Sequence, residues 1–123
     1  MIGYAYVSSF PYYDMHLRQT RFKNRPVLVI GQADSKDYVV LPISRVSVRA
    51  HLDPFYDVEV RPVDVALMGL HSTSYIRTHK QTVLHAASLV RPIVDFRTAY
   101  PDIYIAVIAR VEKFQKDMID KAL

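Results

Sequence analysis

The sequence predicts a mainly β protein, a small barrel of short strands followed by one C-terminal helix. Segments rich in β-branched and aromatic residues recur about every 8–12 residues, with turn residues between them. The hydrophobic period changes to that of a helix only after residue 100. The chain has 123 residues, of which 50% are hydrophobic and 23% charged, so residues 1–123 are expected to form one domain with its own core.

The N-terminal third predicts two strands separated by a polar loop. Residues 2–8 are aromatic and β-branched, which favours a strand, and the Phe-Pro-Tyr-Tyr-Asp stretch at 10–14 is expected to end it. Residues 14–25 carry many basic side chains and predict an exposed loop. The apolar run at 26–30, ended by a glycine, is typical of a central strand, and 32–36 predicts a turn.

The middle of the chain predicts further strands by its alternating pattern. Residues 37–43 indicate a strand in which Pro42 implies an edge position or a bulge. Apolar and polar residues alternate over 44–51 and again over 57–61, with a turn expected at Asp53-Pro54 between them. These patterns add short half-buried strands to the predicted barrel.

The last part of the chain predicts three more strands and the helix. Residues 72–78, 82–84 and 88–94 favour short strands. From 101 to 121 the apolar residues follow helical spacing, and Pro101 suits the first helical turn. The residues expected on the core face of this helix are Ile103, Val107, Val111, Phe114 and Met118.

Composition excludes several function classes. With no cysteine, the chain cannot form disulfides, thiolate zinc sites, iron–sulfur clusters or a cysteine nucleophile. Three glycines are too few for a phosphate-binding glycine-rich loop. No apolar run reaches the roughly 18 residues of a membrane span, and no secretory signal is apparent, so no membrane association is expected. The net charge of +4 is compatible with an anionic partner.

Three stretches in order resemble the MazF/PemK family of toxin endoribonucleases. Residues 3–7, followed by the Phe-Pro-Tyr-Tyr-Asp at 10–14, are similar to the family's opening strand and turn. Residues 23–30 and 40–44 resemble its Arg-Pro strand and the next strand, which ends in a Pro-x-Ser step. Residues 69–77 are similar to its Gly-Leu…Ser-Tyr-Val-Arg segment.

This resemblance implies a fold, an activity and partners. The fold would be an SH3-like barrel of the CcdB/MazF/PemK type, usually a homodimer in the cytoplasm. The activity would be cleavage of single-stranded RNA (mRNA) without metal or cofactor, restrained by a cognate antitoxin protein. The sequence departs from the family at Tyr4, where the family usually has Asp, and at His79, where its PemK-like branch has Asp.

Four residues carry the chemistry that RNA cleavage by its own 2′-hydroxyl requires. Such cleavage needs a base, a proton donor for the leaving oxygen and positive charge for the phosphorane. By resemblance Arg25 would stabilise the transition-state charge, and Arg77 would bind the phosphate or act as the acid. Ser44 offers a hydroxyl to orient the substrate, and His79 would be the base in place of a carboxylate. His16 is the second candidate for acid or base.

Basic side chains near aromatic ones predict contacts to RNA. Residues 12, 13 and 22 are aromatic and lie among cations, an arrangement that allows bases to stack while the cations follow the phosphates. The residues expected to bind RNA are His16, Arg18, Arg21, Lys23, Arg45, Arg49 and Lys80. No metal site is expected, because the histidines lack ligand spacing. Two alternatives remain open: a non-catalytic nucleic-acid-binding barrel or CcdB-like topoisomerase poison, and a module whose basic charge is only surface.

Overall fold

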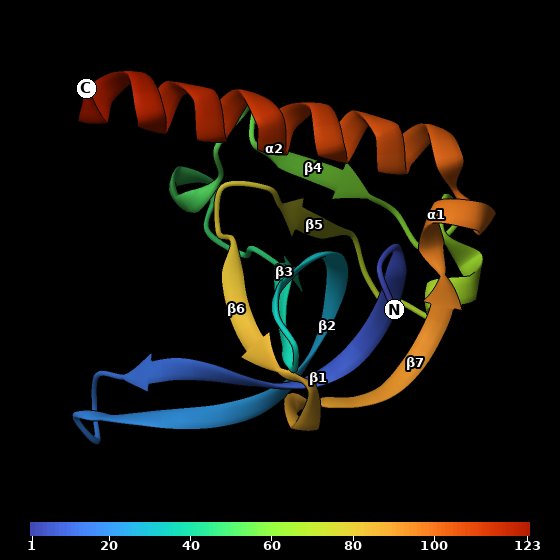
Figure 1. Cartoon of the computed structure of the whole chain (residues 1–123). Coiled ribbons are helices and arrows are strands. Elements are labelled where there is room, and N and C mark those ends of the chain that lie inside the picture. Colours follow the sequence, from blue (N-terminus) through green and yellow to red (C-terminus); the bar gives the residue numbers. More distant parts are fainter.

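The expected mainly β fold with a C-terminal helix is confirmed by a computed structural model that describes residues 1–123 (Figure 1). Seven antiparallel strands curl into a half-barrel, and the long last helix lies along one side of it. The strands are β1 (Tyr4–Asp14), β2 (Gln19–Asp34), β3 (Asp37–Ser44), β4 (Asp57–Val60), β5 (Ser74–Arg77), β6 (Thr82–His85) and β7 (Leu89–Asp95). The helices are α1 (Phe96–Ala99) and α2 (Pro101–Ala122), with short 3-10 turns at Arg49–His51, Ala66–Met68 and Ala86–Ser88.

Strand β3 lies inside the sheet, which corrects the edge position that Pro42 suggested. The strand order is β4-β5-β3-β2-β1-β7, and β6 also pairs with β3. On one side β3 pairs with β2 over residues 37–42, whereas on the other β6 pairs with residues 37–40 and β5 with residues 43–44. Pro42 lies between the segments that pair with β6 and β5, so its missing N–H removes no hydrogen bond to either strand.

Strands β2 and β3, at the centre of the sheet, are buried on both faces where they pair with each other. Leu28 and Leu41 pack in the main core with Val107 of α2. The neighbouring Val27 and Val40 point to the opposite face, where they pack in a second cluster. Because side chains alternate along a strand, burial on both faces requires a continuous apolar run. The prediction of a central strand at 26–30 is therefore confirmed.

A two-stranded arm replaces the predicted loop, and this is the largest correction to the expected elements. Strands β1 and β2 stay paired out to Asp14 opposite Gln19, although β7 accompanies β1 only as far as Ser8. We call residues 9–24 the arm; Figure 1 shows it extending away from the barrel. Residues 10–14 do not end the strand, because the ladder with β2 continues through them and Phe10 packs in the second core cluster.

The alternation at 44–51 does not form a strand. Strand β3 ends at Ser44, and the chain then runs without regular structure to the 3-10 turn at Arg49–His51. Beyond Ser44 no neighbouring strand continues the pairing, so the alternating pattern has no ladder to join. The predicted strands at 57–61, 72–78, 82–84 and 88–94 are all found, as β4 to β7.

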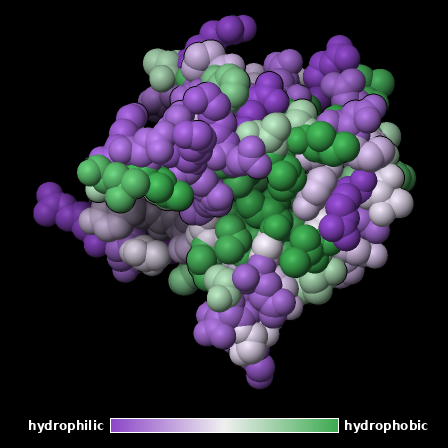
Figure 2. All heavy atoms as spheres, turned by 45° about the horizontal axis from the view of Figure 1, so that its top comes forward, coloured by the Kyte–Doolittle hydropathy of each residue, from purple (hydrophilic) through white to green (hydrophobic).

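Helix α2 runs from Pro101 to Ala122, close to the predicted bounds. Val107 and Val111 are buried as expected, and so is Tyr104, which the spacing did not indicate. Met118 is 54% exposed, because the helix continues past the end of the core. Seen from the side on which α2 lies, hydrophobic side chains gather in the middle of the surface among hydrophilic ones (Figure 2). Neither helix combines the length and apolar character that crossing a membrane requires.

Candidate functional site

Three neighbouring strands bring the four predicted catalytic residues to the same region of the sheet. Arg25 belongs to β2, Ser44 is the last residue of β3, Arg77 is the last residue of β5, and His79 lies in the turn that follows. Ser44 is paired with Tyr75, and the β2–β3 register, continued by two residues, sets Arg25 opposite Ser44. Residues opposite one another, and residues two apart on one strand, share a face of the sheet. The arginines and the serine therefore face the same side.

Arg77 is held by a buried carboxylate that the sequence did not single out. Its Nε donates to Asp57 Oδ1 at 2.9 Å, and its Nη2 donates to Asp57 Oδ2 at 3.2 Å and to the His51 carbonyl oxygen at 2.9 Å. The Asp57 side chain is only 1% exposed and also accepts the backbone N–H of Asp53 at 2.8 Å. These bonds fix the plane of the guanidinium and leave its Nη1 group free to bind an anion.

His79 lies in an aromatic setting that favours its neutral form. Its ring centroid is 5.9 Å from that of Tyr56 and 6.4 Å from that of Phe114 on α2. Burial lowers the pKa of His79 below the usual value, and the charge of Arg77 lowers it further, against an opposing effect of Asp57. Its buried Nδ1 lies 3.8 Å from Asp57 Oδ1 and has no hydrogen-bond partner. The contact is too long for a hydrogen bond, and the lowered pKa of His79 favours its neutral form at neutral pH.

Arg25 is the second cation of this face. It stacks over the ring of Phe10, with 5.1 Å from the guanidinium carbon to the centroid. Burial, and then the charge of Arg77, lowers the pKa of Arg25, which places the two guanidinium groups within each other's field. Between them on the sheet, the Ser44 hydroxyl is buried and has no hydrogen-bond partner. The two cations on this face provide donors for a phosphate, and the hydroxyl between them is buried without a partner.

The predicted RNA-binding residues form two groups. The first lies on the arm: His16 and Arg18 in its turn, Arg21 in an exposed ion pair with Asp14, and Lys23 with its Nζ 5.0 Å from the Tyr12 ring centroid. Lys23 is near enough to Arg25 for that charge to lower its pKa, after the larger effect of burial. The second group lies on the barrel: Arg45 after β3, Arg49 in the 3-10 turn and Lys80 after β5.

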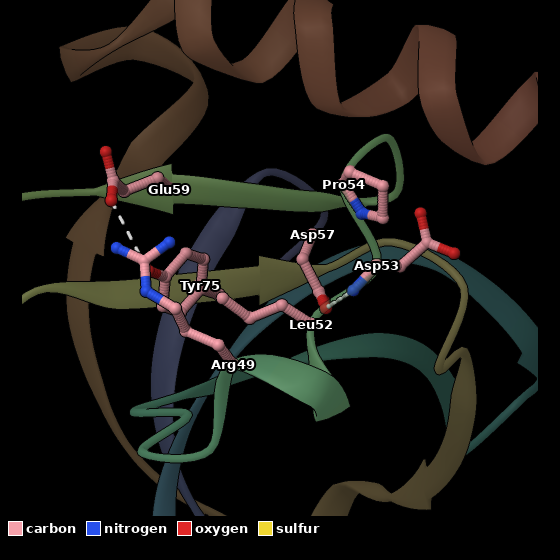
Figure 3. Close-up of a pocket in the computed structure, with 7 residues that line it drawn as sticks. All are labelled: Arg49, Leu52, Asp53, Pro54, Asp57, Glu59 and Tyr75. Atoms are coloured by element: carbon pink, nitrogen blue, oxygen red, sulfur yellow. Dashed lines mark hydrogen bonds between the residues drawn. The ribbon is translucent and has the colours of Figure 1, made fainter.

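A pocket is lined in part by Asp57, the carboxylate that pairs with Arg77 (Figure 3). Its volume is about 520 Å³, and it is lined by Arg49, Leu52, Asp53, Pro54, Asp57, Glu59 and Tyr75. Two backbone N–H groups, of Tyr56 and then Phe55, lower the pKa of the Asp53 carboxyl by donating to it. The Tyr75 hydroxyl donates to Glu59 Oε1 at 3.3 Å. The pocket therefore combines acidic acceptors with an aromatic ring and a cation.

Sequence reasoning missed the residues that support Arg77 and His79. Asp57 begins a predicted strand, but only the register shows that it lies opposite Arg77. Tyr56 precedes it, and its hydroxyl donates to Asp117 of α2 at 3.1 Å. Phe114 was expected in the core but contacts the imidazole instead. No three His, Cys, Asp or Glu side chains are grouped in a way that could hold a metal ion.

A scan against protein-family models and a search of curated proteins find no match to this chain.

Proposed function

We propose that the protein is a metal-independent endoribonuclease that cleaves single-stranded RNA and acts as the toxin of a toxin–antitoxin pair. The observation that carries the proposal is the convergence of Arg25, Arg77 and His79, whose lowered pKa favours the neutral form, in one region of the sheet. Two fixed cations suit a phosphorane dianion, and an unprotonated imidazole can remove a proton at neutral pH. The ordered resemblance to the MazF/PemK family supports the same reaction.

The proposed reaction is an attack within the RNA chain. His79 takes the proton of the 2′-hydroxyl as the 2′-oxygen bonds to phosphorus. The phosphorus–O5′ bond breaks, and Arg77 or water supplies the proton that the leaving oxygen needs. Arg25 and the free Nη1 group of Arg77 hold the phosphate oxygens, and Ser44 orients them. The products are a 2′,3′-cyclic phosphate and a 5′-hydroxyl.

The arm supports the RNA part of the proposal. It carries His16, Arg18, Arg21 and Lys23 together with exposed Phe22 and Tyr13. Bases stack on such rings while cations follow the phosphates, and this works best on an unpaired strand. Arg45, Arg49 and Lys80 extend the positive surface around the site.

The proposed protein partners are a second copy of this chain and an antitoxin in the cytoplasm. Exposed apolar residues support such partners: Met15 and Leu17 on the arm and Ile105 and Ile119 on α2. Strands β4 and β7 end the sheet and are available for pairing. Size measurement of the purified protein tests the second copy, and a small acidic protein, if one is encoded in the neighbouring reading frame, added to the same measurement tests the antitoxin.

The decisive experiment is incubation of single-stranded RNA with the purified protein in EDTA. New fragments ending in cyclic phosphate support the proposal. Arg25→Ala, Arg77→Ala and His79→Ala should each reduce cleavage strongly, whereas the exposed Arg91→Ala and His71→Ala serve as matched controls. Intact RNA after incubation with antitoxin-free protein refutes the proposed reaction.

The same cationic arm supports a non-catalytic binder as the second candidate. A binder would retain RNA or DNA in a salt-sensitive complex without producing new ends. A CcdB-like poison would instead trap a topoisomerase. The EDTA experiment separates both alternatives from the proposed nuclease, because a binder and a poison each leave the RNA intact.

A further inference from the structure

The pocket beside Arg77 has the size of a site for a small molecule. Its volume of about 520 Å³ falls within the roughly 300–1,000 Å³ of such sites. Asp57 forms part of its wall and also holds Arg77 through two hydrogen bonds. A ligand in the pocket would therefore lie next to a phosphate bound at Arg77. In RNA, the group next to a phosphate is a nucleoside.

One end of the pocket holds an aromatic ring, an acceptor and a donor that are not fully used within the protein. Figure 3 shows Arg49, Glu59 and Tyr75 together at this end, and Asp53 and Pro54 at the other. Glu59 Oε1 accepts the Tyr75 hydroxyl, which leaves Oε2 without a partner. The side chain of Arg49 forms no hydrogen bond or ion pair within the protein, although three carboxylates line the same pocket.

The register connects this end of the pocket to the proposed catalytic face. Glu59 is paired with Tyr75, and Tyr75 with Ser44, so the three residues form one row across β4, β5 and β3. Neighbouring strands are about 4.8 Å apart, so Arg25, one strand further, begins about 10 Å from Tyr75. A base at Tyr75 and its phosphate at Arg25 and Arg77 could thus belong to one nucleotide or to adjacent ones.

The donors and acceptors select among the four RNA bases. A carboxylate accepts two parallel N–H groups, and guanine alone offers two adjacent ones, N1–H and the N2 amino group. Adenine and cytosine have an unprotonated ring nitrogen beside the amino group, which would face the carboxylate lone pairs. Uracil has one N–H between two carbonyl oxygens. Arginine pairs with the O6 and N7 acceptors of guanine.

We propose that Arg49, Glu59 and Tyr75 form a binding site for a guanine base of the RNA, next to the phosphate held at Arg77. Glu59 accepts N1–H and the N2 amino group, Arg49 donates to O6 and N7, and the base stacks on Tyr75. This assignment rests on the proposed RNA substrate and gives it a sequence preference.

Calorimetry with the four ribonucleoside monophosphates tests the site without any need for cleavage. GMP should bind at least about tenfold more tightly than AMP, CMP or UMP, because each alternative leaves a charged hydrogen bond unmade. Inosine monophosphate lacks the N2 amino group, and 7-deaza-GMP lacks N7; each should weaken binding by several-fold or more. Equal binding of all four nucleotides overturns the assignment.

Variants of the two glutamates in the chain provide a matched test. Glu59→Gln should remove most of the preference for GMP while leaving the melting temperature close to that of the wild type, because Glu59 is exposed. Glu112→Gln, on the exposed side of α2, should retain the preference. An unchanged preference in Glu59→Gln overturns the role of Glu59 in the site.

Mapping of cleavage positions separates this assignment from the proposed function. RNA cut without guanine enrichment next to the cleaved bond refutes the guanine site and leaves the ribonuclease proposal standing. A preference for GMP in protein that leaves RNA intact supports the site and refutes the cleavage.

Discussion

Replacing Asp57 by alanine tests whether a buried carboxylate holds Arg77 in place. The substitution removes both hydrogen bonds from Arg77 and the bond from the Asp53 backbone N–H. The guanidinium then keeps only the His51 carbonyl oxygen as a protein acceptor. We expect the protein to lose both stability and the fixed orientation of Arg77.

The size of the stability loss follows from burial. The Asp57 side chain is 1% exposed, whereas the Arg77 side chain is 18% exposed. Removing one partner of a fully buried charge pair costs about 3–5 kcal/mol, and water can partly solvate Arg77, so we expect about 3 kcal/mol. For a domain of this size, that corresponds to a fall in melting temperature of about 10–15 °C.

Denaturation followed by circular dichroism at neutral pH measures the effect. Asp64→Ala is the matched control, since Arg61 donates to Asp64 through Nε and Nη2, both at 3.0 Å, in the same two-bond arrangement. That pair is exposed, with side chains 62% and 36% accessible, so its loss should matter far less. If Asp57→Ala and Asp64→Ala lower stability equally, burial does not strengthen the Arg77 pair and the reasoning is wrong.

Because the pKa of His79 is lowered in the folded protein, its neutral imidazole contributes to the free energy of unfolding fully above the ordinary histidine pKa of about 6.5. As the pH falls below that value, the unfolded chain takes up the proton first, so this contribution is lost until the pH passes the lower folded-state pKa. Denaturation of wild type and His79→Gln from about pH 7.5 to about pH 5 checks this, and parallel curves would contradict it. Gly3→Ala should cost about 1–3 kcal/mol, since φ is +89° and the new Cβ would lie 2.9 Å from Arg97 Cβ. Gly69→Ala, with φ +66° and open space, should cost less in the same melts, and the reverse order would refute the steric argument. Phe22→Ala, at a side chain 65% exposed, should leave the melting temperature unchanged but weaken single-stranded RNA binding by about 5- to 100-fold in a filter assay.

The elements that could be predicted from the sequence are those in which the spacing of apolar residues matches the positions that are buried. The run at 26–30 is apolar at every position because both faces of β2 are covered there, and the helical spacing around Val107 and Val111 reflects contact with the core. The arm shows no such pattern. Its strands are stabilised by their own ladder and by cross-strand contacts such as that of Lys23 with Tyr12. These contacts require no alternation of buried and exposed residues, so the sequence of the arm carries no strand period.

For the candidate site, residue type indicated the cations but not their supports. Arg25, Arg77 and His79 stand out because their side chains can contact phosphate or carry protons. Asp57 has an ordinary place at the start of an alternating strand, and its importance depends on the β4–β5 register, which no local pattern specifies. The contact between Phe114 and His79 likewise depends on how α2 crosses the barrel.

The length of the arm can change without a change in the barrel. Beyond Ser8 and Arg25 the two strands pair mainly with each other, so residues can be removed or added at the turn without disturbing the core. Side chains alternate between the two faces of a strand. An insertion or deletion therefore keeps the same side chains on the ligand-binding face only if it adds or removes two residues in each strand. Such a change alters the length by about 6.6 Å. Related or engineered chains can therefore vary the span of their contacts in discrete steps while keeping the same fold.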